Sequence, residues 1–309
     1  MRAGVKLAFV SALLAGTVIY LFASTVNAQE IDCLACHQDF DFESPAHPDV
    51  ACHDCHSNVT AEHEGKDLEP LTDEDSCLSC HSRTNREIGR SVHDGQAGCT
   101  DCHDDPHHIH EVGDVHAITS AANQIRTCGA CHDSEEMPLE LYVASEHGRA
   151  VLLSGLTMAP GCTDCHGAAH RIFAVDSDRS PTTRENAPEM CGTCHEFLLH
   201  DWQEMSAHGL VWMENEEGPI CTDCHASHDI VDPTTAASRI ASPDNCGGCH
   251  DAYLGTFRDS FHGQATDLGM AKGAVCADCH TPHQNLPAAD PRSSVHPDNL
   301  IETCGQCHD

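Results

Sequence analysis

The cysteine pattern constrains this 309-residue chain more than any other feature. All 22 cysteines fall into Cys-x-x-Cys pairs, and a histidine follows each of the eleven pairs at once. If the 27 histidines were scattered at random, eleven such matches would have odds of roughly 10⁻¹². The motifs are Cys33, Cys36, His37; Cys52, Cys55, His56; Cys77, Cys80, His81; Cys99, Cys102, His103; Cys128, Cys131, His132; Cys162, Cys165, His166; Cys191, Cys194, His195; Cys221, Cys224, His225; Cys246, Cys249, His250; Cys276, Cys279, His280; and Cys304, Cys307, His308.

The spacing within each motif has a chemical reason. Cys-x-x-Cys-His is the attachment signature of c-type haem. Two thiols three residues apart lie on one side of a helical turn, where they can bond to the two vinyl groups on one edge of a porphyrin. The histidine that follows can turn its imidazole under the ring and bind iron as the proximal ligand. The sequence therefore predicts eleven covalent haem c groups, each with its iron.

Three other chemistries use the same residues. Four-thiolate zinc sites would need an even number of pairs, whereas this chain has eleven. Such sites also give no reason for a histidine after each pair. A disulfide scaffold suits an exported chain rich in cysteine, but it would not fix the same spacing eleven times. Thioredoxin-like redox motifs occur singly on a βαβ pattern, and no such pattern is visible. Haem attachment explains the residues better than any of these.

The composition would otherwise predict disorder. Leu, Ile, Val and Phe make up about 16% of the residues after Ala28, and the formal net charge is -34. With roughly 26 residues per haem, the porphyrins themselves must form the core. We therefore expect a haem-cored fold of short α-helices and irregular loops, with little or no β-sheet. The haem-free chain should be disordered, which circular dichroism of that form would test.

The motifs alternate between two types, which defines a repeat. The first motif of a repeat often carries Gly after its first Cys, and the second usually has Asp before its second Cys. Five repeats lie near 33–63, 77–116, 128–175, 191–232 and 246–286, and a half repeat follows at 304–308. The glycines are Gly129, Gly192, Gly247 and Gly305, and the aspartates are Asp54, Asp101, Asp164, Asp223 and Asp278.

Sixteen histidines outside the motifs can supply distal ligands. Each repeat has a middle histidine between its two motifs and a trailing histidine after its second motif; His296 is the nearest candidate for the last haem. The predicted distal ligands are His47, His63, His93, His107, His147, His170, His208, His228, His262, His283 and His296. The surplus is His53, His108, His110, His116 and His200, of which His108, His110 or His116 could replace His107. The pairing of ligands cannot be derived from the sequence.

Other side chains have no recurring place in the repeat. The methionines after the N-terminus are expected to pack against porphyrin faces rather than bind iron. Trp202 and Trp212 are likewise expected to be packing residues. We predict helices over 134–147, 195–208 and 251–262, each ended by a glycine (Gly148, Gly209, Gly263), so that the middle histidine lies at a helix C-terminus. The stretches 176–188 and 286–297 should be surface loops.

Residues 1–28 are typical of a secretory signal. Arg2 and Lys6 precede the uncharged apolar run from Leu7 to Ala23, and a small-residue cleavage site ends at Ala28. The alternative is an uncleaved membrane anchor. Residues 29–309 would form the cytochrome domain, in the periplasm, at the outer membrane or outside the cell. The acidic charge makes nucleic acid an improbable partner and suits either basic partner surfaces or simple solubility.

The motifs give the chain a clear resemblance to multihaem c-type cytochromes with doubled Cys-x-x-Cys-His repeats. The stretches from Cys221 to His228 and from Cys276 to His283 carry it, and it covers nearly all of 33–308. Length and haem density also resemble the periplasmic decahaem cytochromes that fill outer-membrane barrels, although this chain has one motif more and a different spacing. The likeness to cytochromes that form extracellular filaments is looser. The resemblance implies closely spaced haems, mostly with two histidine ligands, that conduct electrons.

Three functions would suit a chain with these motifs. An electron carrier or conduit, with a redox protein as donor and another as acceptor, needs no open coordination site and no catalytic residue. A reductase of a small nitrogen or sulfur oxyanion needs a haem with a free distal position, often with Lys in place of the motif histidine, whereas all eleven motifs here end in His. A quinol-oxidising membrane subunit would need residues 7–23 as an anchor. The sequence favours the electron carrier.

Overall fold

The computed structural model describes residues 32–40, 42, 44–57, 59, 63, 76–103, 105–134 and 139–309. The predicted signal at 1–28, Met137 and part of the predicted helix at 134–147 lie outside the described residues. The chain divides into two compact units, Met1–Phe40 and Asp41–Asp309. In the described part of the first unit, a 3-10 helix, η1 (Cys33–Ala35), carries the first motif. Its turn is closed by the His37 N–H, which donates to the Cys33 carbonyl at 3.0 Å.

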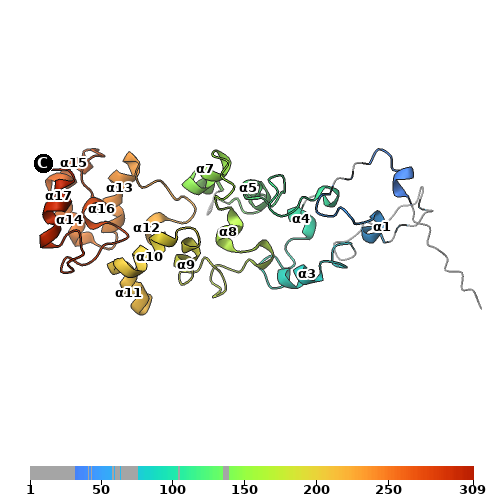
Figure 1. Cartoon of the computed structure of the whole chain (residues 1–309), viewed down its shortest axis with the longest axis horizontal. Helices are drawn as coiled ribbons and strands as arrows, with labels where there is room; N and C mark the ends of the chain where they lie inside the picture. Colours follow the sequence, from blue (N-terminus) through green and yellow to red (C-terminus); the bar gives the residue numbers. More distant parts are fainter. Residues whose placement is uncertain are drawn as a thin grey trace, which may run out of the picture. The chain divides into compact units, whose positions relative to one another are not determined.

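The second unit is a succession of short helices, shown in sequence colours in Figure 1. No β-strand occurs in the ranges that the structure describes, which confirms the predicted helical class. The elements are α1 (Cys52–Cys55), α3 (Ser82–Ile88), α4 (Cys99–His103), η2 (Pro106–His108), α5 (Ala121–Gly129), α6 (Leu139–Ala144), α7 (Glu146–Leu152), α8 (Cys162–His166), η3 (Ala169–Arg171), α9 (Ala187–Gly192), α10 (Glu196–Met205), α11 (Ala207–Asn215), α12 (Cys221–His225), α13 (Ala236–Gly247), α14 (Asp251–Asp259), α15 (Phe261–Asp267), α16 (Cys276–His280), η4 (Pro297–Asn299) and α17 (Leu300–Gly305).

The recurring Asp of the second motif caps its own helix. These helices have only four or five residues, so their first N–H groups need outside acceptors. In all five repeats the Asp side chain accepts a hydrogen bond from the backbone N–H three residues earlier, at 2.7–2.9 Å. The carboxylate also interacts favourably with the positive end of the helix. The aspartate therefore stabilises the turn that presents both thiols.

The glycine of the first motif permits close packing by the next helix. A Cβ atom on Gly192 or Gly247 would lie 2.3 Å from a methyl carbon of Leu199 or Leu254. Those leucines belong to α10 and α14, the helices that follow the motif. A larger residue at either position would therefore force the leucine side chain of the following helix to move.

The predicted position of the middle histidine is wrong in the third, fourth and fifth repeats. The first helix ends earlier, at Ala144, Met205 or Asp259, and a serine then caps a second helix. The histidine lies at the second position of that new helix, and the glycine after it does not end a helix. A Cβ atom on the glycine would lie about 2 Å from a carbonyl oxygen of the preceding helix, so glycine allows the sharp turn. The serine, histidine and glycine sets are Ser145, His147, Gly148; Ser206, His208, Gly209; and Ser260, His262, Gly263.

The polypeptide alone buries few apolar side chains. One cluster, in the fourth repeat, joins Ala187, Trp202, Trp212 and Ile220, with Leu199 packed against it. The two indole rings lie 6.4 Å apart. Elsewhere large apolar side chains are exposed in the described structure, such as Phe197 at 85% and Ile301 at 88%. This is the pattern expected where a cofactor, rather than side chains, supplies most of the core.

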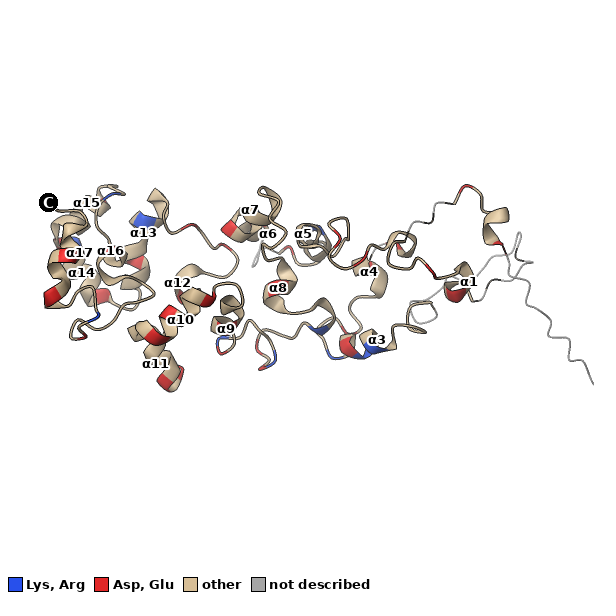
Figure 2. Cartoon of the chain, viewed as in Figure 1, with Lys and Arg blue, Asp and Glu red and all other residues tan. Residues whose placement is uncertain are grey.

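Charge is distributed as the composition suggests. Acidic side chains lie on helices along the whole second unit, whereas basic ones are concentrated at a few places such as α3 and α13 (Figure 2). No helix within the described ranges has the length and apolar character needed to cross a membrane.

Candidate haem sites

Each motif forms one helical turn. The N–H of the motif histidine donates to the carbonyl of the first Cys four residues earlier, for example at 2.8 Å for His56 and 2.9 Å for His132. This places the two thiols of each pair on the same side of the turn, as the attachment chemistry requires. All 22 cysteines are half-buried or exposed.

Nine of the motif histidines face a histidine from outside the motifs. Their ring centres lie 5.9–6.1 Å apart. A metal ion bonded to both imidazoles at about 2.0 Å would put the ring centres about 6 Å apart. The pairs, motif histidine second, are His47–His81, His107–His56, His93–His132, His170–His103, His147–His195, His228–His166, His208–His250, His283–His225 and His262–His308.

These pairs follow one rule, which we call cross-repeat pairing. The middle histidine of a repeat faces the first motif of the next repeat, as His147 faces His195. The trailing histidine faces the second motif of the previous repeat, as His228 faces His166. Every one of the nine pairs therefore joins two consecutive repeats.

Backbone hydrogen bonds reinforce the cross-repeat pairing. The residue before a middle histidine donates its N–H to the carbonyl two residues after the trailing histidine of the next repeat. The four bonds are Ala46 to Ile109 at 3.1 Å, Val92 to Ile172 at 2.9 Å, Glu146 to Ile230 at 2.8 Å and Ala207 to Asn285 at 3.2 Å. The polypeptide thus brings the middle and trailing histidines of successive repeats side by side.

Outer hydrogen bonds orient several of these imidazoles. The Asp105 carboxylate lies 3.0 Å from Nδ1 of His107, whose ring stacks on that of His56 with the ring centres 5.9 Å apart. Asn285 lies 3.0 Å from Nδ1 of His208 and also binds the Ser206 hydroxyl at 2.6 Å. Such partners fix the ring orientation and tautomer of a metal-binding histidine.

Burial keeps the paired rings in the form that binds metals. Burial lowers the pKa of His103, His147, His166, His208 and His225, and the facing histidine lowers each of them further. A lowered pKa favours the neutral imidazole at physiological pH, and the neutral imidazole is the ligand. The electrostatics and the ring spacing therefore fit haem iron between these rings.

Motifs that are consecutive in the sequence also lie close together in space. Within repeats three to five, the first Cys of one motif lies beside the first Cys of the other, and this neighbour together with burial raises the pKa of Cys128, Cys221 and Cys276. Between repeats, the pKa of Cys165 is raised by burial and also by charges that include Cys194. Similar proximities join Cys55 to Cys77, His103 to His81, Cys102 to Cys131, Cys224 to Cys246 and Cys279 to Cys304. Motifs two to eleven thus form an unbroken series of neighbours.

Other predicted ligands behave differently. The assignment of His37 and His63 as haem ligands stays a prediction. His280 and His296 form no ring pair with any histidine, although all 27 histidines lie within the described ranges. Of the surplus histidines, His53 and His200 are exposed beside Asp54 and Asp201. His110 and His116 face each other at 5.7 Å around Asp114.

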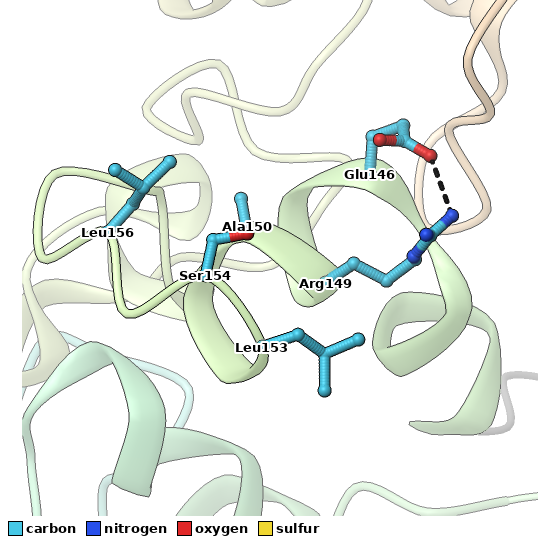
Figure 3. A pocket seen from close by; sticks show the side chains of 6 residues that line it. All are labelled: Glu146, Arg149, Ala150, Leu153, Ser154 and Leu156. Atoms are coloured by element: carbon cyan, nitrogen blue, oxygen red, sulfur yellow. Dashed lines mark hydrogen bonds and ion pairs between the residues drawn. The ribbon is translucent and has the colours of Figure 1, made fainter.

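A cavity of about 290 Å³ lies on α7, the helix that also carries His147. Its lining, drawn in Figure 3, consists of Glu146, Arg149, Ala150, Leu153, Ser154 and Leu156. Arg149 and Glu146 form an ion pair at 3.2 Å. No histidine or cysteine lines the cavity, so it offers no haem ligand.

Comparisons with known proteins point to the same class. Residues 233–309 match the family described as cytochrome c7 and related cytochrome c. The chain is also 25% identical over 195 residues to the multiheme cytochrome MtrA of Shewanella baltica strain OS185, covering 57% of this chain. The chain spans about half the length (52%) of this curated relative. These matches confirm the predicted resemblance to multihaem c-type cytochromes and support haem c as the cofactor.

Proposed function

We propose that this protein is an electron conduit that carries one haem c on each of its eleven motifs. When bound, haem c supplies an iron centre that takes up and releases one electron. The nine histidine pairs at 5.9–6.1 Å are the observation that carries the proposal, because this spacing suits a metal between the rings. The paired residues would be proximal and distal ligands, and His37 would be the proximal ligand of the first haem.

The chain's own residues would set the order of transfer. Motifs two to eleven adjoin one another in sequence order, so electrons would pass along the repeats rather than between distant ones. Two histidines on each of the nine paired irons would leave no position for a substrate there, which suits transfer rather than chemistry. Cross-repeat pairing would also make each of these nine irons a link between repeats, so the fold and the conduit would form together.

The N-terminal segment, the charge and the comparison with MtrA bear on the cellular setting. A signal at 1–28 would export the chain, and the acidic surface would attract basic surfaces of a redox donor or acceptor. The similarity to MtrA favours the periplasm and partners in a conduit to the cell exterior. An outer-membrane barrel, a quinol-oxidising complex or self-assembly are the partners to test.

The first experiment counts haems on the exported holoprotein. Intact mass and the pyridine haemochrome assay should give eleven haems, and the same mass should show cleavage after Ala28. Colourless protein, or protein that holds zinc, would contradict the proposal.

The second experiment tests the ligand pairs. His228→Gln should turn one low-spin haem high-spin, because His228 faces His166 at 5.9 Å. The matched control is His200→Gln, since His200 is 68% exposed and faces no motif. Electron paramagnetic resonance should show a new high-spin signal in the first variant only; equal spectra would mean that the ring pairs do not bind iron.

A further inference from the structure

Two segments that lie in contact carry a large share of the chain's positive charge. Residues 82–93 include α3, and residues 166–175 include η3, which packs against α3. The backbone N–H of Val92 joins them by donating to the Ile172 carbonyl at 2.9 Å. Together the segments hold four of the chain's 15 Lys and Arg residues but only one of its 49 acidic residues; the positive charge on α3 can be seen in Figure 2. We call the four residues the arginine patch: Arg83, Arg86, Arg90 and Arg171.

The arginines of the patch are exposed, and most of them meet no carboxylate. All four residues are exposed to solvent. In the part of the chain that the structure describes, Arg83 alone of the four has an ion-pair partner, the Glu87 carboxylate at 3.5 Å. Five arginines elsewhere each form an ion pair: Arg149, Arg184, Arg239, Arg258 and Arg292. The patch can therefore bind carboxylates of another molecule, since a guanidinium forms paired hydrogen bonds with a carboxylate.

The arginine patch adjoins two of the histidine pairs. Helix α3 begins directly after His81, the motif histidine that faces His47. The turn η3 contains His170, which faces His103. Haems on the third and fourth motifs would therefore lie beside the patch, where a protein docked on it could exchange electrons with them.

We propose that the arginine patch docks an acidic electron-carrier protein, which exchanges one electron with a haem on the third or fourth motif. The inference rests on the proposed function, since it needs haem c on these motifs. The electron would pass between the partner's redox centre and the haem iron, so that one is oxidised as the other is reduced, and no bond would form or break. The formal charge of -34 makes the rest of the surface repel such a partner, so the patch would determine where it docks. At physiological salt, charges more than about 8 Å away are largely screened, which favours the local charge over the net charge.

Electron-transfer kinetics with flavodoxin, an acidic one-electron carrier, test the proposal. Arg86→Glu with Arg90→Glu should slow the reduction of the holoprotein by reduced flavodoxin about tenfold at low ionic strength, and the difference should disappear at high ionic strength. The matched control is Arg149→Glu with Arg292→Glu, which changes the net charge equally outside the patch and should slow the reaction by less than about twofold. Unchanged kinetics in the patch variant, or equal losses in both variants, would overturn the proposal.

Three further measurements separate docking from other roles of the arginines. Oxidation of the reduced holoprotein by mitochondrial cytochrome c, a basic protein, should be no slower in the patch variant. A loss of rate with both probes, or one that persists at high ionic strength together with shifted midpoint potentials, would mean that the arginines act on haem propionates and would overturn the proposal. Self-association that only the patch variant loses, with unchanged flavodoxin kinetics, would assign the patch to a second copy of this chain and would overturn it as well.

A failure of the proposed function would be seen in the mass of the holoprotein's peptides. These should show haem on Cys77 and Cys80 and on Cys99 and Cys102, in the natural protein and in both variants. A natural protein without haem there would refute the proposed function at these motifs. Full haem content with the contrary kinetics would refute only the docking surface.

Discussion

The third, fourth and fifth repeats make the same long-range contact with different side chains. In each, a side chain before the first motif is tied to the helix of the second motif, 39 residues further on. Gln124 donates to the Thr163 hydroxyl at 3.0 Å and accepts from its N–H at 3.1 Å. Arg184 binds both oxygens of Asp223, at 3.0 and 2.9 Å, and Arg239 binds those of Asp278, at 3.1 and 2.8 Å. We call this contact the tether. It is present in all three repeats, but it is neutral in the third and an ion pair in the fourth and fifth.

The arginines do more than replace a neutral tether. Arg239 also donates to the carbonyls of Ala271 and Gly273, and Arg184 to that of Gly218. The aspartates that they bind are the ones that cap the second-motif helices. A planar guanidinium suits such bidentate contacts. In a chain with only 15 Lys and Arg residues, the fourth and fifth repeats thus place a cation beside the second motif, and the third does not.

Removing the fifth-repeat tether should have the largest effect on the free energy of unfolding. Arg239→Ala should lower the free energy of unfolding by about 2 kcal/mol, because it removes a bidentate ion pair and two backbone contacts at a half-buried site. Guanidinium unfolding of the holoprotein measures this. Arg292→Ala, which removes the exposed pair with Asp290, should change nothing measurable. Equal losses in both variants would mean that the tether is only a surface ion pair.

Removing the neutral tether of the third repeat should have the second-largest effect on the free energy of unfolding. Gln124 is 7% exposed and also donates to the Thr119 carbonyl at 2.9 Å. Gln124→Ala should cost about 1.5 kcal/mol, since it leaves the Thr163 N–H without its acceptor and opens a small void. Gln124→Glu keeps the size and the acceptor but loses the amide donor. A fully stable Ala variant in the same unfolding experiment would show that the third repeat needs no tether.

Removing the fourth-repeat tether should lower the free energy of unfolding less than removing the fifth-repeat tether. Arg184 is 45% exposed in its side chain and Asp223 is 39% exposed, against 29% and 32% for Arg239 and Asp278. Solvent screening should hold the loss in Arg184→Ala to about 1 kcal/mol, even though the guanidinium also lies 5.5 Å from the Trp212 ring. A larger loss than in Arg239→Ala would show that the Trp212 contact, rather than burial of the ion pair, decides the order.

The sequence predicted the helical class and the residues of the nine pairs because both depend on short-range spacing. It did not predict which histidines pair, since cross-repeat pairing depends on contacts such as that of Glu146 with Ile230, 84 residues apart. It also assigned Gly148 the wrong role: a glycine after a histidine suits a helix end, and only the path of the preceding helix shows that it permits a close turn. The tethers were missed because Gln124 and Arg184 do not share a residue type.

The smallest effect that we expect from changing a tether is on the redox potential of the nearby haem. This effect tests directly whether the difference in charge between the tethers matters for electron transfer. A guanidinium beside a haem favours the reduced state, which carries one positive charge less, and so raises the midpoint potential. Arg239→Gln should therefore lower the potential of the haem on Cys276 and Cys279, because it leaves the charge of Asp278 unbalanced. Potentiometric titration of the holoprotein followed by electron paramagnetic resonance measures this, with Arg292→Gln as the control. If the two titration curves coincide, the tethers in repeats three to five differ in stability alone, and their difference in charge has no part in electron transfer.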